Sequence, residues 1–574
     1  MKKQTIRLWQ PPELIPAEVD MQLAAFPALF RQILFNRGIK DVDAASSFLE
    51  GEESLNDPFL MKGMDEAVER ITTAIAKNQR IVIFGDYDVD GVTATVLLVQ
   101  VISKLGGYVR KYIPNRFLEG YGFSDDGLKG ALELNPDLII TVDCGIRSVD
   151  EISRAKNIGV DVIVTDHHLP LEKIPDACAV LCPWQPGDSY PYKELAGVGI
   201  AYKLGEALMS RLSEFPPSIS SWLDLAAVGT VADVAPLTGE NRSIVRKGLS
   251  LMRNGNRSGL IALALVSGID IAKLTARDIG YVIGPRLNAA GRLSTAKKAY
   301  QVLSADSFTE AEFIARELDE ENRERQKITK EIQAKAEENT DISENEWLVY
   351  DTSETYNEGV IGLAASRLAE SFYRPAIIGT ITGEFIKASC RSIPNLNITA
   401  ALDQCAALLE RHGGHEMAAG FLMKRDNERE FIEKVTLIVS TEMKEKDLKP
   451  QINYDAEVSI SNLNLSFLQL INQLEPTGSH NPPPLFRLNN VKVTGLQRLG
   501  ENRDHLKFFV VDRRKENENS VKPLPAIAFR LAERYLELKD GDLIDILFSF
   551  EENEYNGNKS LQLKVRDIKK RSAD

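Results

Sequence analysis

An alternation of apolar strands and helices between residues 64 and 181 constrains the fold of this chain more than any other feature. The predicted strands are nearly continuous apolar runs, such as 81–84, 138–142 and 160–165, and helical patterns separate them. Strands that are apolar on both faces and joined by helices form a parallel sheet covered on both sides. We therefore expect an α/β fold with a parallel-sheet core.

Acidic residues and histidines follow the predicted strands where each strand ends. In chain order they are Asp86, Asp88, Asp90, Asp143, Asp166, His167 and His168. In open α/β sheets the carboxyl ends of the strands form the binding crevice. The sequence therefore predicts a functional site at this edge of the sheet.

The spacing of the first three aspartates suggests what this site binds. Alternate residues of an extended segment project to the same side, so Asp86, Asp88 and Asp90 can converge on one point. Clusters of carboxylate oxygens suit Mg²⁺ or Mn²⁺. For this segment alone, a solvated acidic loop that caps the next helix is an equally good interpretation.

Together with residues farther along the chain, these aspartates form a candidate metal centre. Its candidate ligands are Asp88, Asp90, Asp143, His167 and Asp233. Two cations held by such a set can activate water and stabilise a phosphoryl displacement. Asp86 and His168 lie beside the ligands as candidate catalytic residues, although His168 could instead be a structural histidine.

Composition excludes several other classes of protein. The chain has 574 residues and a net charge of −14, which argues against indiscriminate coating of nucleic acid. It lacks a GxxxxGK[ST] loop, an apolar run near the roughly 20 residues of a membrane span, and a secretory signal. Its five scattered cysteines fit a reducing compartment. We therefore expect a cytoplasmic enzyme with no membrane contact.

The remaining chain predicts further domains. A loop at 284–292 carries Arg286 and Arg292 and suits an anion, although surface arginines on a turn would give the same pattern. A highly charged helix at 311–338 is typical of a solvated spacer. Short strands beyond residue 450 predict a small β-barrel of the OB type. The predicted domains are an N-terminal extension (1–60), a catalytic domain (61–310), a connecting helix (311–345), a second α/β domain (346–445) and a barrel (450–574).

The predicted barrel has a possible track for single-stranded nucleic acid. Basic residues accompany Phe508 and Phe509 there, and aromatic rings can stack on successive bases. Adjacent residues of a strand face opposite sides, so only one of the two rings can be exposed.

Four motifs resemble those of the DHH phosphoesterases. They are Asp86-Tyr87-Asp88-Val89-Asp90-Gly91, Val142-Asp143-Cys144-Gly145, Asp166-His167-His168 and Gly229-Thr230-Val231-Ala232-Asp233. The segment Gly413–Gly420 resembles the glycine–histidine signature of the associated DHHA1 domain. With segment 284–292 and the barrel, the pattern is similar to that of the bacterial members that degrade single-stranded DNA from the 5′ end. The resemblance implies a DHH core joined by a long helix to a DHHA1 domain, with an OB-fold that guides the strand.

The resemblance also implies roles for individual residues in the metal centre. The five candidate ligands match the metal ligands of the family, and Asp86 and His168 belong to the same motifs. The chain departs from the pyrophosphatase members at Phe84, where those relatives carry a histidine.

A second set of residues matches the substrate-binding positions of the family. Ser389 and Arg391, together with Arg292, resemble a pocket for a 5′-phosphate. His415 resembles a DHHA1 residue that contacts a substrate phosphate, and Arg286 in the same arginine segment is a further candidate.

The function implied by the resemblance is that of a 5′→3′ exonuclease in DNA recombination and repair. It would degrade single-stranded DNA to 5′-mononucleotides with two divalent cations, Mn or Mg. Its implied partners are single-stranded DNA, a single-strand-binding protein and a helicase, and we expect a monomer. Two alternatives are a nanoRNase or cyclic-dinucleotide phosphodiesterase, which would not need the barrel, and a catalytically silent scaffold, which would not need intact ligands.

Overall fold

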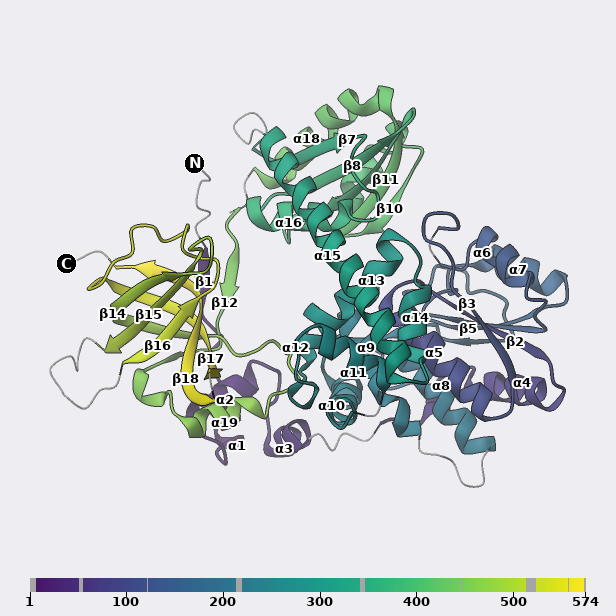
Figure 1. Cartoon of the computed structure of the whole chain (residues 1–574), viewed down its shortest axis with the longest axis horizontal. Helices are drawn as coiled ribbons and strands as arrows, with labels where there is room; N and C mark the ends of the chain where they lie inside the picture. The colour runs from purple at the N-terminus through teal and green to yellow at the C-terminus, as the bar shows by residue number, and fades with distance from the viewer. Residues whose placement is uncertain are drawn as a thin grey trace.

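The computed structural model describes residues 7–571, apart from 51–54, 121, 213–218, 256, 341–345, 445, 447, 513–522 and 556. These residues form two α/β domains, a long connecting helix and a β-barrel (Figure 1). The α/β core, the long helix and the barrel are as predicted. None of the described helices has both the length and the hydropathy of a membrane span, and all five cysteines are free thiols.

The first α/β domain is built on a five-stranded parallel sheet of order β3-β2-β4-β5-β6. Its strands are β2 (Arg80–Gly85), β3 (Tyr108–Tyr112), β4 (Leu138–Val142), β5 (Asp161–Thr165) and β6 (Ala179–Leu181). Ile81 and Ile83 of β2 lie in one apolar core, whereas Val82 and Phe84 lie in another. Side chains of successive residues point to opposite faces, so this sheet is covered on both sides, as its sequence predicts.

Helices supply both covering layers (Figure 1). The layer on the Ile81 side contains α4 (Met64–Ala76), α5 (Val89–Lys104) and α8 (Gly197–Leu212). The layer on the opposite side contains α6 (Asp125–Leu132) and α7 (Val149–Asn157). Since α5 begins directly after β2, its first turn lies at the carboxyl edge of the sheet.

A helical region completes this domain and corrects one prediction. Its helices include α9 (Leu223–Ala232), α10 (Gly239–Arg253), α11 (Ser258–Val266), α13 (Gly284–Leu293) and α14 (Lys297–Ser304). We expected a loop at 284–292, but this segment forms α13. Pro285 lies in the first turn, where proline favours helix. A Cβ added to Gly291 would lie 3.0 Å from the Tyr87 carbonyl oxygen, so this glycine permits close packing.

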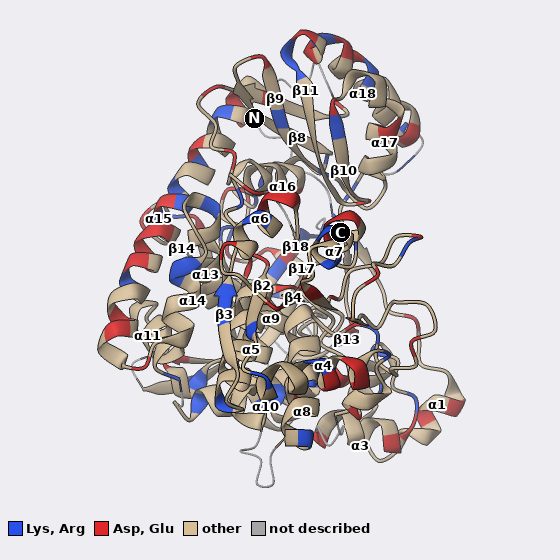
Figure 2. Ribbon diagram, turned by 90° about the vertical axis from the view of Figure 1, so that its right-hand side faces the viewer, with Lys and Arg blue, Asp and Glu red and all other residues tan. Residues whose placement is uncertain are grey.

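The connecting helix α15 (Phe308–Asn339) is less solvated than its sequence suggests. Lys, Arg, Asp and Glu positions alternate along it (Figure 2). Its stripe of apolar residues is nevertheless buried: Ile314 and Leu318 join the core of the first α/β domain, and Ile332 joins that of the second. The helix therefore belongs to both hydrophobic cores and is not a free spacer.

The second α/β domain has a mixed sheet of order β10-β11-β9-β8-β7. Its strands are β7 (Val349–Ser353), β8 (Ala376–Thr382), β9 (Phe385–Arg391), β10 (Arg411–His415) and β11 (Ala418–Lys424). Its helices are α16 (Ile361–Phe372), α17 (Ile398–Gln404) and α18 (Glu428–Met443). The glycine–histidine segment is therefore a hairpin of two paired strands.

The C-terminal strands close into the predicted barrel. They are β14 (Phe486–Leu499), β15 (His505–Asp512), β16 (Leu524–Ala528), β17 (Leu543–Tyr555) and β18 (Asn558–Lys570). Pairing continues from β14 through β15, β16, β18 and β17 back to β14. Phe508 is buried and Phe509 is 38% exposed, which confirms that only one of these rings faces outward.

The N-terminal helices pack against this barrel, far from them in the sequence (Figure 1). They are α1 (Ala17–Gln22), α2 (Ala28–Phe35) and α3 (Val42–Glu50). Phe30 and Leu34 share one apolar core with Phe486 and Val565. In addition, β1 (Leu8–Gln10) pairs in parallel with β12 (Gln451–Asn453). The two ends of the chain therefore build one domain.

A buried arginine attaches the first α/β domain to the domain that contains the barrel. Arg242 of α10 donates hydrogen bonds to the carbonyl oxygens of Leu474 (2.7 Å), Glu475 (2.9 Å) and Pro476 (3.1 Å). It also lies over the ring of Phe48, 3.9 Å from the centroid. A guanidinium group has five N–H donors, so Arg242 can bind several carbonyl oxygens of this segment at once.

Candidate active site

The aspartate segment after β2 combines a helix cap with two buried carboxylates. Asp88 is the N-cap of α5, and its Oδ1 accepts hydrogen bonds from the backbone of Asp90 (2.9 Å) and Gly91 (3.1 Å). Asp86 and Asp90 are buried. Both interpretations of this segment therefore hold in part, since one aspartate caps the helix and its neighbours face the interior.

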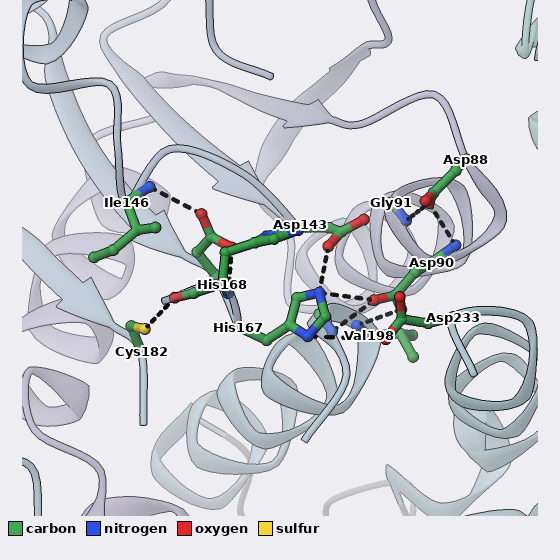
Figure 3. Close-up of polar contacts among 12 residues, drawn as sticks. Asp88, Asp90, Gly91, Asp143, Ile146, His167, His168, Cys182, Val198 and Asp233 are labelled. Carbon is green, nitrogen blue, oxygen red and sulfur yellow. Dashed lines mark hydrogen bonds and ion pairs between the residues drawn. The ribbon is translucent and has the colours of Figure 1, made fainter. Parts of the chain in front are cut away.

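Side chains from separate elements meet Asp90 at the carboxyl edge of the sheet (Figure 3). Nε2 of His167 lies 3.1 Å from Oδ1 of Asp143 and 3.9 Å from Oδ2 of Asp90. Nδ1 of the same ring lies 3.8 Å from Oδ2 of Asp233, which follows α9. Residues 143 positions apart in the sequence are thereby brought together, because β2, β4 and β5 end side by side and α9 ends beside His167.

The possible ligand atoms form three overlapping groups. One is Asp143, His167 and His168, and the other two together contain all the predicted ligands. Asp90, His167 and Asp233 form one of these two groups, and Asp86, Asp88 and Asp143 form the other, with ligand atoms within 4.8 Å of one another in each. The His167–Asp143 distance joins the two groups. All five residues predicted as ligands, and Asp86, therefore lie in one cluster.

Unpaired buried atoms support a metal at this cluster. Oδ1 of Asp86, Oδ1 of Asp143 and Nε2 of His167 are buried and have no hydrogen-bond partner within the part of the chain that the structure describes. Buried polar atoms without partners are costly and rare in folded proteins. Since carboxylate oxygens and a neutral imidazole are the donors that Mn²⁺ and Mg²⁺ accept, these residues fit a divalent cation.

The protonation behaviour of the carboxyl groups agrees with this assignment. Burial, followed by the charge of Asp88, raises the pKa of Asp90 to about 7. Burial and then the charges of Asp90 and Asp88 raise the pKa of Asp233 to about 9. The pKa of Asp143 is also raised well above its usual value, mainly by burial. These carboxylates repel one another, and positive charge at their centre would relieve the repulsion.

The two adjacent histidines have different environments. Burial and the neighbouring His168 lower the pKa of His167 to about 4, which keeps its imidazole neutral and able to bind metal. Burial acts to lower the pKa of His168, but a 2.7 Å contact between its Nδ1 and Oδ1 of Asp166 raises it overall. Asp166 also accepts a hydrogen bond from the backbone of Ile146 (2.9 Å). It therefore orients His168, a role that we did not assign from the sequence.

A glycine at the start of α8 allows close packing on the buried carboxylate of Asp90. Oδ2 and Oδ1 of Asp90 accept hydrogen bonds from the backbone of Gly197 (2.6 Å) and Val198 (2.8 Å) at the start of α8. A Cβ added to Gly197 would lie 2.9 Å from Oδ2 of Asp90 and 2.7 Å from Cβ of Asp143. The glycine therefore allows a helix N-terminus to approach the buried carboxylate.

A cationic cluster, called the arginine pocket below, lies close to the Asp86–Asp88 group, since the charge of Arg292 acts on the pKa of Tyr87. Nη1 of Arg391, at the end of β9, donates a hydrogen bond to Oγ of Ser389 (3.0 Å). Burial, followed by nearby arginines that include Arg391, lowers the pKa of Arg292 to about 10. The structure thus gathers three predicted phosphate-binding residues, contributed by α13 and β9.

Sequence reasoning missed Arg116, which lies between this pocket and the aspartates. Its guanidinium lies 5.2 Å from the ring centroid of Tyr87. Its charge acts on the pKa values of Arg292, Arg391 and Asp86. The loop after β3 carries Arg116 to the carboxyl edge of the sheet. Its place just after a predicted strand was the sequence signal that could have indicated a role at the site.

Two other predicted substrate residues lie in different settings. Arg286 is bound by Asp319 of α15, with its Nη2 2.8 Å from Oδ1 of that residue. This pair fastens α13 to α15, and a role for Arg286 in substrate binding stays a prediction. His415 is exposed at the end of β10, and its role also stays a prediction. Phe84, the departure from the pyrophosphatase pattern, packs edge-on against Phe123 with ring centroids 4.9 Å apart.

Comparisons with known proteins agree with this fold. Models of the DHH family N-terminal domain, the DHHA1 domain and the RecJ OB domain match residues 80–230, 345–441 and 454–567. The chain is therefore a DHH phosphoesterase that carries a DHHA1 domain and an OB domain.

The relatives identify the branch of this class. The single-stranded-DNA-specific exonuclease RecJ of Bacillus subtilis is 38% identical over 94% of this chain and 67% of its own length. That of Dickeya dadantii is 34% identical over 95% of this chain and 96% of its own. The structure of Thermus thermophilus RecJ with Mn²⁺ matches 99% of this chain and 80% of its own, with a TM-score of 0.82 and 31% identity. A structure of the Thermus protein with Mg²⁺ has a TM-score of 0.77 and 29% identity, with 99% of this chain and 79% of its own covered. The chain belongs to the RecJ family.

Proposed function

We propose that this chain is a 5′→3′ exonuclease that hydrolyses single-stranded DNA to 5′-mononucleotides with divalent cations. The observation that carries the proposal is the position of the arginine pocket directly beside the carboxylate–histidine cluster. Tyr87 lies between Asp86 and Asp88 in the sequence, and its carbonyl packs against Gly291. Arg292 directly follows Gly291, so it is held close to the cluster. A strand end bound by the pocket would therefore have its first phosphodiester near the cluster.

The cluster would hold the cations. Its proposed ligands are Asp88, Asp90, Asp143, His167 and Asp233. When bound, two Mn²⁺ or Mg²⁺ ions would lower the pKa of water and stabilise the charge that develops on the phosphodiester. Asp86 adds negative charge beside the ligands, and His168, oriented by Asp166, can donate a hydrogen bond from Nε2 to a phosphate oxygen.

The arginine pocket would set the direction of degradation. Arg292, Arg391 and the Ser389 hydroxyl can donate several charge-assisted hydrogen bonds to a terminal 5′-phosphate. An interior phosphodiester has fewer free oxygens and cannot fill the pocket in the same way. The strand would then be cut one nucleotide from its 5′ end.

The barrel would hold the strand that follows. Phe509 is exposed on β15 and can stack on a base, whereas Phe508 lies in the core. The basic residues 513–515, which we expected on this track, lie outside the described residues. We further propose a monomeric, cytoplasmic enzyme of recombination and repair that acts with a single-strand-binding protein and a helicase; membership of the RecJ family supports this proposal.

The proposal is tested by degradation of end-labelled strands with Mn²⁺, Mg²⁺ or chelator. We expect mononucleotides from a 5′-phosphorylated single strand with either cation, and no products with chelator or from a blunt duplex. Digestion that starts at the 3′ end, or that continues in chelator, would overturn it. A dinucleotide substrate distinguishes this activity from that of a nanoRNase, which would prefer the short substrate.

A further inference from the structure

A cavity of about 230 Å³ adjoins the metal cluster at His167 and Asp233. The arginines neighbour the Asp86–Asp88 group, whereas the cavity is lined by His167 and Asp233 of the other group. Its remaining lining residues are Trp184, Glu194, Leu195, Val234, Ala235 and Pro236. A strand that places one phosphodiester at the cluster would therefore have an adjacent nucleotide beside this cavity.

The charge of the lining decides which part of a nucleotide fits. The eight residues that line the cavity include the carboxylates of Asp233 and Glu194 but no Lys or Arg. A phosphate would meet repulsion there, whereas an uncharged base would not. Pockets that enclose a whole small-molecule ligand span roughly 300–1,000 Å³, so this smaller cavity suits a single ring system.

Trp184 gives the cavity an aromatic wall. It follows β6, the strand next to the one that delivers His167, and its side chain is 38% exposed. The turn that carries it is fixed by Gln185, whose Nε2 donates hydrogen bonds to the carbonyl oxygens of Val180 (2.6 Å) and Lys62 (3.2 Å). The backbone next to Trp184 is thus held in place before any ligand binds, and the partly exposed indole lines the cavity.

The opposite part of the lining carries a strained residue. Val234 follows Asp233 with a φ of 64°, a conformation that β-branched residues rarely adopt, and it is 69% exposed. Strain of this kind occurs preferentially at functional sites. Here it presents an apolar side chain at the cavity beside a metal-cluster residue.

We propose that this cavity is a nucleobase subsite in which Trp184 stacks on the base of a nucleotide next to the phosphodiester being cut. The inference rests on the proposed nuclease function and adds a base-binding role for residues that lie outside the metal cluster. Such stacking does not depend on base identity, because every base has a π-face. The subsite would therefore position the strand for cleavage without imposing a sequence preference.

The test combines variants of Trp184 with strands that lack one base. Wild type, Trp184→Ala, Trp184→Leu and Trp184→Phe are compared on a 5′-phosphorylated strand and on versions with an abasic nucleotide at position one, two or three. We expect Trp184→Ala and Trp184→Leu to lower kcat/KM on the intact strand about tenfold, and Trp184→Phe to retain most activity. At one abasic position the deficit of both variants should disappear, because the partner base is missing. Phe313→Ala on α15, at a residue that is 66% exposed and outside the lining, serves as the control and should match wild type on every strand.

Two outcomes would overturn the subsite. One is a Trp184→Leu enzyme that equals wild type on the intact strand, and the other is a deficit that is the same on intact and abasic strands. Fluorescence anisotropy of the same strands in chelator measures how the loss in affinity caused by a Trp184 variant depends on the abasic position; this dependence is the coupling between Trp184 and the base. It needs no hydrolysis, so it reports on the subsite even if the wild-type protein fails to degrade DNA. Loss of wild-type hydrolysis with intact coupling would instead refute the proposed function. Trp184→Leu keeps the apolar bulk and replaces the alanine variant if that one does not fold.

Discussion

Asp143 occupies a central place among the individual residues of the site. Its buried Oδ1 has no hydrogen-bond partner among the described residues, and it lies 3.1 Å from Nε2 of His167, so it bridges the two groups of ligand atoms. A residue with this position affects both proposed cations when it is changed. Its neighbours Asp86 and Asp90 contact one group each.

Substitution of Asp143 should separate hydrolysis from DNA binding. We expect Asp143→Asn to reduce degradation of a single strand on the order of 10²–10³-fold, because it removes a charge that the reaction needs. Affinity for the strand, measured by anisotropy in chelator, should stay near that of wild type, since the barrel and arginine pocket are unchanged. Asp150→Asn, at an exposed residue of α7, is the matched control. Normal turnover by the Asp143 variant would refute the proposed metal site.

Substitution of Arg391 should change end selection more than overall binding. Hydrogen bonds to charged groups contribute about 1.5–3 kcal/mol, so Arg391→Ala should reduce the preference for 5′-phosphorylated over 5′-hydroxyl strands by roughly 10- to 100-fold. The preference is the ratio of kcat/KM for the two substrates. Arg411→Ala, at an exposed residue of β10, is the comparison variant. Equal losses on both strands would argue against a phosphate pocket.

At the scale of elements, the pocket depends on how the start of α16 meets the end of α13. A Cβ added to Gly359, two residues before α16, would lie 1.9 Å from the Arg292 carbonyl oxygen. The distance is far shorter than any real contact. The two segments therefore pack in direct backbone contact, and this packing fixes the position of Arg292 relative to Arg391.

We expect Gly359→Ala to force these segments apart. Overpacking of this kind costs typically about 1–3 kcal/mol, and it should lower both thermal stability and the preference for 5′-phosphorylated strands. Differential scanning fluorimetry and the two-substrate ratio measure the two effects. In Gly280→Ala the new Cβ would make only an ordinary contact at 3.5 Å from Val231, so this variant should change neither. A Gly359→Ala enzyme with full selectivity would contradict the packing argument.

Elements of the barrel carry a pH-dependent contribution to stability. Asp545 of β17 accepts hydrogen bonds from Nε of Arg571 (2.6 Å), the backbone of Asn490 (2.8 Å) and Nη2 of Arg487 (3.2 Å). Burial acts to raise the pKa of Asp545, but these partners lower it overall. A lowered pKa in the folded state means that the contribution is present above about pH 4 and is lost as pH falls through the folded pKa.

Asp545→Asn should therefore destabilise the barrel at pH 7 and much less at low pH. The expected cost at pH 7 is about 1–3 kcal/mol, because two arginines lose a charged acceptor. Hydrogen exchange of β17 amides at pH 7 and at about pH 3 measures the difference, after correction for intrinsic exchange rates. The exposed Glu537, changed to Gln, is the control. If Asp545→Asn destabilised the barrel equally at both pH values, the loss would come from altered packing and not from the lost negative charge.

Elements also show how far sequence reasoning extends. The parallel sheet and its metal cluster were predictable because β2, β4 and β5 are continuous apolar runs and their carboxyl ends must adjoin. The 284–292 segment was predicted wrongly as a loop, since its glycines serve tertiary packing and not a turn. Arg116 received no role, because its partners come from distant elements that only the folded chain brings together. Asp166 also received none, although it contacts His168 only two residues away, because the sequence does not show how the two side chains are oriented. The apolar stripe of α15 looked too sparse to be buried for a related reason: it is shared between two cores.

At the scale of the whole molecule, Arg242 holds the catalytic region and the barrel in a fixed relation. Its guanidinium is buried and bound to backbone carbonyls of the segment 473–476. Removal of the side chain would leave these carbonyls with fewer donors in a closed interface. The strand path from the metal cluster to the barrel depends on this interface.

We expect Arg242→Ala to impair long substrates more than short ones. Hydrolysis of a strand of a few nucleotides requires only the first domain and the arginine pocket, whereas a long strand also uses the barrel. The ratio of kcat/KM for long and short strands should fall, and small-angle scattering should report a larger radius of gyration. Lys247→Ala, at an exposed residue of the same helix, should leave both measurements unchanged. Equal loss on long and short strands would indicate general unfolding instead.

The domain shared by α1–α3 and the barrel has a consequence for synthesis of the protein. Phe30 and Leu34 emerge early from the ribosome, but their partners Phe486 and Val565 are made more than four hundred residues later. The nascent chain must therefore carry unpaired apolar helices while both α/β domains fold between them. Exposed apolar segments of this kind attract chaperones and aggregate readily. The order of translation thus delays burial of the N-terminal helices against the barrel until the C-terminal strands have been made.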